Sequence, residues 1–348
     1  MFRRLDGTDL LVTSGPAAEV FRVSVDPFAF VSTIRWCDHR RELIVAATPR
    51  GSHVPDVSAN DRGDVRLFAC DPRNGVWRQV YRGYAQDPVC LPDGGYVVHR
   101  GAGLTFLDIE GAVVREVKVG RFGWGSPSLS INPSGDTVAW VRWRGDDQKL
   151  CVEGVEPGQS AQFRPSIYRY AWLDSHTVIY LHGAGPRLLD IVSGRTRMFG
   201  SGLRNHVGRG VGGATAQLLS LAKLPADQVW EFYGDLQVVG DHVWYSATLT
   251  EQRSSRRVDG LFRADRDGTG LDLVASMAPD DRVEGFFALP DRSALILVAT
   301  YEGTTIVDRH EMVVGPVAEF LASGWPPLLD SNHPEFGFQG LPGRPTGA

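Results

Sequence analysis

The chain has 348 residues, of which 43% are hydrophobic and 22% charged, and its formal net charge is −5. These values are ordinary for a globular protein, and they exclude the strong positive field that proteins binding nucleic acid or anionic membranes carry. No segment reaches the ~18 consecutive apolar residues of a membrane span, and the two arginines near the start precede no apolar segment, so no secretory signal is expected.

The four cysteines, Cys37, Cys70, Cys90 and Cys151, lie in strand-like segments without CxxC spacing. Isolated thiols in apolar strands are typical of buried free cysteines. We therefore expect no structural disulfide, no metal site and no cofactor. A cytoplasmic location is the expectation that follows.

In chain order, strands are first expected within residues 9–25, and six copies of a strand-turn-strand unit follow. The turns of the six copies lie at Asp38, Pro92, Pro133, Asp174, Gly240 and Pro290. Pro133 follows Pro92 by 41 residues, and Asp174 follows Pro133 by 41. Repeats of this length, made of strands and tight turns, predict a β-propeller.

A second recurring unit follows most of these copies. It is a strand that ends in Asp or Glu, then a turn containing glycine, as in residues 65–75, 104–111, 150–158, 187–194 and 261–270. Asp supplies a side-chain acceptor and glycine a positive φ, which tight hairpins require. Each repeat thus contains the strands of one antiparallel blade.

The corner Asn132-Pro-Ser-Gly-Asp-Thr-Val-Ala-Trp140 and the turn Asp265-Arg-Asp-Gly-Thr-Gly270 are similar to TolB-like propeller repeats, a group related to WD-type propellers. The resemblance covers roughly residues 30–315. It implies the propeller fold and says almost nothing about function.

The predicted fold is a single all-β propeller of four-stranded antiparallel blades, formed by residues 1–320. Six blades are preferred and seven are the alternative. The strands within residues 9–25 would close the ring, either by completing the sixth blade or by joining C-terminal residues as a seventh. Residues 321–348 form a tail rich in proline and glycine, and a short helix is expected near residues 212–224.

Three long connections mark one face of the predicted propeller. They are residues 49–64, 202–229 and 250–259, and all of them leave the blades on the face where the first strands begin. The turns on the opposite face are short. Because long loops on rigid scaffolds tend to carry function, this loop-rich face is the predicted functional surface.

Side chains at the mouth of the channel on that face are the candidate site residues. The catalytic candidates are Glu231, Glu284, His99 and His182; the ligand-binding candidates are Trp124, Tyr168, Tyr233, Arg100, Arg144 and Asp87. Such a mixture of carboxylates, aromatic rings and arginines suits a small polar or anionic ligand. The alternative for His99 and His182 is that they satisfy backbone groups near Gly101 and Gly183.

Two functions stay open. The first is a monomeric propeller that binds a small molecule or a protein at the loop-rich face, without nucleic-acid or membrane partners. The second is a stand-alone propeller enzyme of hydrolase, lyase or cyclase type, with acid/base chemistry at the channel mouth. The sequence contains no GxSxG, P-loop, HExxH or strand-associated GxGxxG motif that would select one chemistry.

Overall fold

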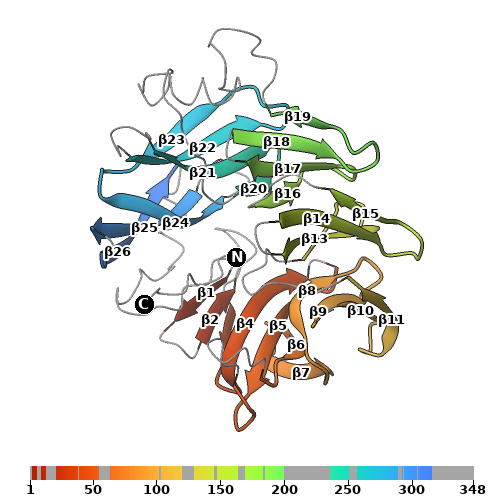
Figure 1. The fold of residues 1–348 in the computed structure, drawn as a ribbon. Helices are drawn as coiled ribbons and strands as arrows, with labels where there is room; N and C mark the ends of the chain where they lie inside the picture. Colours follow the sequence, from red (N-terminus) through yellow and green to blue (C-terminus); the bar gives the residue numbers. More distant parts are fainter. Residues whose placement is uncertain are drawn as a thin grey trace.

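The computed structural model describes residues 2–5, 9–12, 21–37, 39–54, 63–101, 103–119, 129–144, 147–163, 169–182, 185–199, 236–250, 257–288, 292, 294–303 and 305–315. The regular elements within these ranges are β-strands, and they form seven antiparallel sheets (Figure 1). Among these residues, no helix has the length and hydropathy needed to cross a membrane. The helix predicted near residues 212–224 lies outside the described residues.

An N-terminal sheet and six further sheets, which we number as blades 1 to 6, follow one another along the described chain. The N-terminal sheet contains β1 (Phe2–Leu5), β2 (Asp9–Val12) and β3 (Phe21–Ser24). Blade 1 contains β4 (Phe28–Cys37), β5 (Glu42–Pro49), β6 (Arg66–Asp71) and β7 (Val76–Tyr81). Blade 2 contains β8 (Gln86–Cys90), β9 (Tyr96–Arg100), β10 (Gly103–Leu107) and β11 (Val113–Lys118). Blade 3 contains β12 (Ser130–Ile131), β13 (Thr137–Arg144), β14 (Asp147–Gly154) and β15 (Ser160–Phe163).

The remaining blades repeat this order. Blade 4 contains β16 (Tyr170–Trp172), β17 (Thr177–His182), β18 (Gly185–Asp190) and β19 (Thr196–Met198). Blade 5 contains β20 (Leu236–Val239), β21 (His242–Thr250), β22 (Arg257–Asp265) and β23 (Asp272–Ser276). Blade 6 contains β24 (Asp281–Ala288), β25 (Ala294–Glu302) and β26 (Thr305–Val314).

Each blade is a meander in which strands adjacent in sequence pair with one another. The first strands of successive blades also contact each other, as β4 does with β8, β8 with β12, β16 with β20 and β20 with β24. First strands that meet in this way surround the axis of a propeller (Figure 1). The predicted all-β propeller of antiparallel, mainly four-stranded blades is confirmed.

The N-terminal strands pair among themselves, and none of the described strand pairs joins them to blade 6. β3 packs on blade 1, where the indole nitrogen of Trp77 donates a hydrogen bond to the carbonyl of Ser24 at 2.7 Å. Both alternatives for closing the ring, with six blades or with seven, therefore stay predictions.

The hydrophobic core is divided among the junctions between sheets. Each of six clusters of buried side chains combines residues from two successive sheets. Trp140 packs between blades 2 and 3, Trp172 between blades 3 and 4, and Trp244 between blades 5 and 6. The strands therefore carry apolar residues on both sides, which explains runs such as Leu43–Ala47 that are fully buried without alternation.

Asn132 organises the corner of blade 3 and is only 2% exposed. Its Oδ1 accepts hydrogen bonds from the backbone amides of Asp136 (3.0 Å) and Thr137 (3.1 Å). Its Nδ2 donates to Asp136 Oδ1 at 2.7 Å and, across the junction, to the carbonyl of Ser175 in blade 4 at 3.0 Å. One amide side chain thus fixes a turn and joins two blades.

Arg115 joins blades 2 and 3 in a similar way. Its Nη1 lies 3.1 Å from Glu153 Oε1 on β14, and its Nη2 donates to the carbonyl of Gly154 at 2.6 Å. The guanidinium also stacks over the ring of Phe106, 4.0 Å from its centroid. The Glu153 side chain is 8% exposed, so this ion pair is largely desolvated.

The expectation of four free thiols is wrong, because Cys37 and Cys90 form a disulfide with a Cα–Cα distance of 5.7 Å. Each cysteine is the last residue of the first strand of its blade, and the first strands of blades 1 and 2 are in contact. Cysteines from different blades therefore meet, whereas the sequence prediction placed the thiols in different blades, where no two need be adjacent. Cys70 and Cys151 are free and buried, and burial raises the pKa of their thiols to about 12 and about 11.

Candidate functional site

One face of β4 carries polar side chains toward blade 2. Thr33 Oγ1 donates a hydrogen bond to Asp87 Oδ1 at 3.1 Å, and Cys37 is bonded to Cys90 of β8. Arg35 lies between Thr33 and Cys37 in β4, and its charge interacts with that of Asp87. Because side chains alternate along a strand, the intervening Ile34 and Trp36 pack on the opposite side, against the N-terminal sheet.

Asp87 occupies an unusual backbone position. It is the second residue of β8 and has a positive φ of 45°. The pairing of β8 with β9 is irregular between Gln86 and Val89. Residues other than glycine rarely adopt such a φ, and where they do the strain often accompanies a functional constraint. Asp87 was among the predicted ligand-binding residues.

Two further blades contribute hydroxyl groups. Ser130 is the first residue of β12 and Tyr170 the first of β16. Ser130 Oγ donates to the Tyr170 hydroxyl at 2.9 Å, and that hydroxyl donates to the carbonyl of Ala139 at 2.7 Å. The charge of Arg35 also acts on Tyr170. We call Thr33, Arg35, Asp87, Ser130 and Tyr170 the inner-strand cluster, since each lies on the first strand of its blade.

The cluster is strongly desolvated. Burial is the largest influence on each of its ionisable groups: it raises the pKa of Asp87, raises the pKa of Tyr170 and lowers the pKa of Arg35. Each of these residues nevertheless keeps part of its surface accessible. Partial accessibility combined with strong desolvation is expected for groups that face the channel of a propeller and not open solvent.

Arg35 has no close counterion among the described residues. Its charge is attracted by Asp87, but no described side chain forms an ion pair with it within 4.0 Å. Its Nε is buried and lacks a hydrogen-bond partner in this part of the chain. A partly buried guanidinium whose Nε has no hydrogen-bond partner is energetically costly. It therefore marks a position at which a bound anion would be favoured.

The other predicted residues lie away from the cluster or have undescribed side chains. His99 is buried, and its Nε2 lies 2.9 Å from the carbonyl of Gly101, as the backbone alternative anticipated. Arg100 is exposed and forms an ion pair with Glu116 at 2.6 Å. Arg144, His182 and Glu284 lie in strands β13, β17 and β24, but their side chains are outside the described set.

Four predicted residues, Trp124, Tyr168, Glu231 and Tyr233, lie outside the described residues, as does the connection 202–229. The connections 49–64 and 250–259 are described only in part. The predicted roles of these residues stay predictions. Within the described ranges, no group of three or more His, Cys, Asp or Glu side chains is arranged to hold a metal ion.

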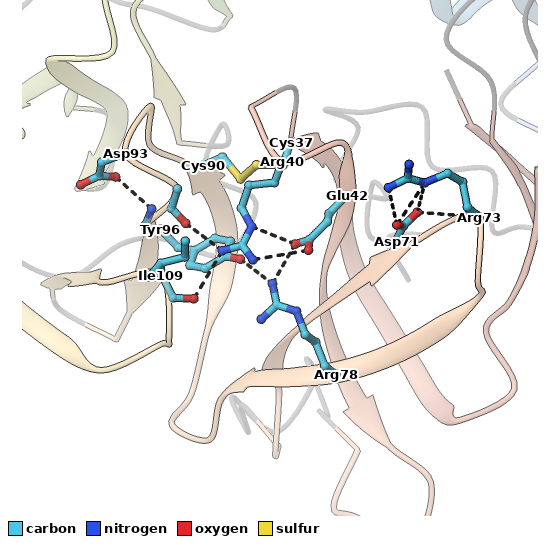
Figure 2. Close-up of polar contacts among 12 residues, drawn as sticks. Cys37, Arg40, Glu42, Asp71, Arg73, Arg78, Cys90, Asp93, Tyr96 and Ile109 are labelled. Carbon is cyan, nitrogen blue, oxygen red and sulfur yellow. Dashed lines mark hydrogen bonds and ion pairs between the residues drawn. A yellow bond between two sulfur atoms is a disulfide. The ribbon is translucent and has the colours of Figure 1, made fainter.

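A second polar cluster joins blades 1 and 2 near the disulfide (Figure 2). Glu42 accepts from Arg40 Nε at 3.2 Å and from Arg78 Nη2 at 2.7 Å. Arg78 also donates to the Tyr96 hydroxyl at 3.0 Å, and Arg40 donates to the carbonyl of Ile109 at 3.4 Å. Each of these charges already has protein partners, so we assign this Arg40 network a structural role.

Of the inner-strand cluster, the sequence predicted only Asp87 and missed Thr33, Arg35, Ser130 and Tyr170. The available signal was Arg35 itself, the one charged residue in the segment Val31-Ser-Thr-Ile-Arg-Trp-Cys37. Charged residues are rarely buried in strands without a purpose. Only residues near strand ends were predicted to line the mouth of the channel, and Arg35 lies inside its strand.

Comparison with solved structures gives matches at low sequence identity. An oligogalacturonate lyase in complex with manganese matches 88% of this chain and 81% of its own at 14% identity, with a TM-score of 0.51. A putative 6-phosphogluconolactonase from Bacteroides fragilis matches 86% and 89% at 13% identity, with a TM-score of 0.48. The β-propeller domain of the Trilobed protease from Pyrococcus furiosus matches 95% and 94% at 12% identity, with a TM-score of 0.47.

No protein-family model matches the sequence, and a search of curated proteins gives no match. The similarity to the oligogalacturonate lyase concerns the fold alone, because the identity is 14%. The two matches with TM-scores of 0.48 and 0.47 support no property of this chain. The resemblance to TolB-like repeats therefore stays a prediction at the level of the family. By its fold, the chain is a β-propeller.

Proposed function

We propose that this protein binds a small anionic ligand at the inner-strand cluster, with Arg35 as the principal contact. The observation that carries the proposal is the desolvated guanidinium of Arg35, which has no ion-pair partner among the described residues. Arginine presents several donors in one plane, and these match the oxygens of a carboxylate or phosphate. A bound anion would supply the hydrogen bonds that the surrounding strands do not.

Asp87 narrows the class of ligand. Its carboxyl group lies close enough for its charge to act on Arg35, and Thr33 holds Oδ1 by a hydrogen bond. A negatively charged Asp87 would repel a second ligand charge and would accept hydrogen bonds from ligand hydroxyls. The combination favours a monoanion that also carries hydroxyl groups, such as a sugar acid, over a compact dianion.

Binding to purified protein tests this proposal by calorimetry with glucuronate, with glucose as a neutral control of similar size. We expect glucuronate to bind and glucose to bind at least ten times more weakly. Arg35→Gln should weaken glucuronate binding by about tenfold or more, because a charged hydrogen bond is lost. Arg100→Gln is the matched control, since Arg100 is exposed and already paired with Glu116.

The proposal fails if Arg35→Gln and Arg100→Gln bind glucuronate equally well. It also fails if the wild-type protein binds none of glucuronate, succinate and inorganic phosphate. A protein partner at the loop-rich face would then be the better hypothesis, and residues 49–64, 202–229 and 250–259 would be the segments to test by deletion.

An enzymatic role for the same cluster is the second candidate, and Asp87 is the observation that favours it. Burial raises the pKa of Asp87, and its backbone is held at a positive φ. A carboxyl group of raised pKa next to a bound substrate is the usual form of a general acid. Asp87→Asn should then retain ligand binding but abolish turnover of a glycoside or ester of the bound acid. A variant with unchanged turnover would contradict the catalytic role.

The predicted cytoplasmic location is open to the same kind of test. The Cys37–Cys90 bond is formed in this structure, and disulfides persist mainly in oxidising compartments. The disulfide and the predicted cytoplasmic location therefore lead to different expectations for the thiols in cells. Trapping the thiols of the protein in its native cells with an alkylating reagent would distinguish the two cases. A fully alkylated pair would support the cytoplasm, and an unalkylated pair would support an oxidising compartment.

A further inference from the structure

The disulfide and the proposed ligand contacts share the same two strands. Arg35 and Cys37 lie on the same side of β4, two residues apart, while Asp87 and Cys90 belong to the short strand β8. The Cys37–Cys90 bond therefore fixes the position of β4 relative to β8 immediately beside Arg35 and Asp87. The Thr33–Asp87 hydrogen bond holds the same two strands on the other side of Arg35.

We propose that the Cys37–Cys90 disulfide is a redox-sensitive control of ligand binding. When it is formed, it keeps Arg35 and Asp87 at the spacing that binds the anion. When it is reduced, β8 moves more freely against β4 and the affinity falls. This inference rests on the proposed function for its effect on the ligand, while its effect on the two strands stands independently.

The expected motion is local because other contacts hold the junction. The Arg40 network and the buried cluster that includes Ile44, Leu67 and Tyr96 join blades 1 and 2 without help from the disulfide. Strand β8, by contrast, has only five residues and an irregular pairing with β9. Loss of the disulfide should therefore affect β8 more than the blades as whole units.

A dithiol is the reductant that the proposal requires. Cys37 is buried, whereas Cys90 keeps part of its surface accessible, so the thiolate of the dithiol attacks the sulfur of Cys90. The Cys37 sulfur leaves as a thiolate, and a mixed disulfide forms on Cys90. The second thiol of the reductant then attacks its own sulfur in that bond, which releases Cys90 and yields the cyclic disulfide of the reductant. Two electrons and two protons pass to the protein.

The experiment compares the oxidised protein, the protein reduced with dithiothreitol, and the double variant Cys37→Ser/Cys90→Ser. Hydrogen exchange measured by mass spectrometry reports on β4 and β8, and calorimetry reports on glucuronate binding. Cys70→Ser is the matched control, because Cys70 is a buried free thiol in the same blade. Far-UV circular dichroism verifies that each protein remains folded.

We expect faster exchange in peptides covering β4 and β8 in the reduced protein and the double variant, with unchanged exchange in blade 5. Glucuronate affinity should fall by about tenfold, as contacts that had been preorganised become mobile. Cys70→Ser should match the wild type in both measurements.

Equal glucuronate affinity in the oxidised and reduced proteins would overturn the inference, whatever the exchange shows. If no form binds glucuronate, succinate or phosphate, the proposed function fails and exchange alone decides. Faster exchange confined to β4 and β8 would then support the redox-sensitive junction, and unchanged exchange would refute it.

Discussion

Replacing Arg115 with alanine should destabilise the junction between blades 2 and 3 far more than its surface position on β11 would indicate. The change removes the bond to Glu153 Oε1 at 3.1 Å, the bond to the carbonyl of Gly154 at 2.6 Å and the stacking over Phe106. Glu153, whose side chain is 8% exposed, is left with an unpaired charge. We expect a loss of about 3 kcal/mol in the free energy of unfolding.

Arg100→Ala is the control, because the Arg100–Glu116 pair joins the same two types of residue with side chains that are 49% and 55% exposed. Its loss should cost less than about 0.5 kcal/mol. Urea unfolding of both variants, followed by tryptophan fluorescence, measures the difference.

The pH dependence of Arg115→Ala provides a second check on the same reasoning. Burial raises the pKa of Glu153, and the charge of Arg115 opposes part of that rise. Without Arg115 the pKa rises further, so the variant gains stability relative to the wild type as the pH falls and Glu153 takes up a proton. Equal losses in Arg115→Ala and Arg100→Ala, with no pH dependence, would refute the argument from desolvation.

Three further outcomes are expected from urea unfolding. Asn132→Ala should lower the free energy of unfolding by about 2 to 4 kcal/mol. The loss should clearly exceed that of Asp174→Ala at the equivalent but exposed corner of blade 4, where the Asp174 carboxylate accepts from two local amides. Similar losses in the two variants would contradict the role of Asn132 in joining two blades. Hydrogen bonding by Asn132 lowers the pKa of Asp136 below the ordinary value of 3.8, so the stabilisation by Asp136 is complete above that value and is lost as the pH falls through the lowered pKa; Asp136→Asn should therefore lose its disadvantage in strong acid, and a constant deficit would contradict the sign. Cys37→Ser/Cys90→Ser should lose at most about 4 kcal/mol by the chain-entropy relation for a sequence separation of 53, and an unchanged midpoint would indicate that the pair is not bonded in solution.

The parts of the fold that depend on local sequence could be predicted. The corner at Asn132 and the glycine turns made the repeat recognisable in the sequence, because short turns tolerate few residue types. Asp87 could be nominated because it comes at the start of a first strand, a position that the repeat itself defines. These inferences required only the order of strands along the chain.

The parts that depend on contacts between blades could not be derived in the same way. Cys37 and Cys90 lie in separate repeats, and their pairing follows from the way first strands converge on the axis. Arg35 lies inside its strand, and Asp87, whose charge acts on it most strongly among the described residues, belongs to the next blade. The spacing of residues within one repeat does not show which residues of two neighbouring blades lie at the same height along the propeller axis and so come into contact.

The division of the core among junctions has a consequence for how the chain loses structure. Each buried cluster combines residues of two successive sheets, so no blade has a hydrophobic core of its own. Opening one blade therefore exposes apolar surface on both of its neighbours. The free energy of unfolding of such an array is approximately the sum of the contributions of the single repeats and of the interfaces between neighbouring repeats. A defect at one junction should therefore weaken the two adjacent blades most, and its effect should decrease with the number of junctions that separate a blade from the defect.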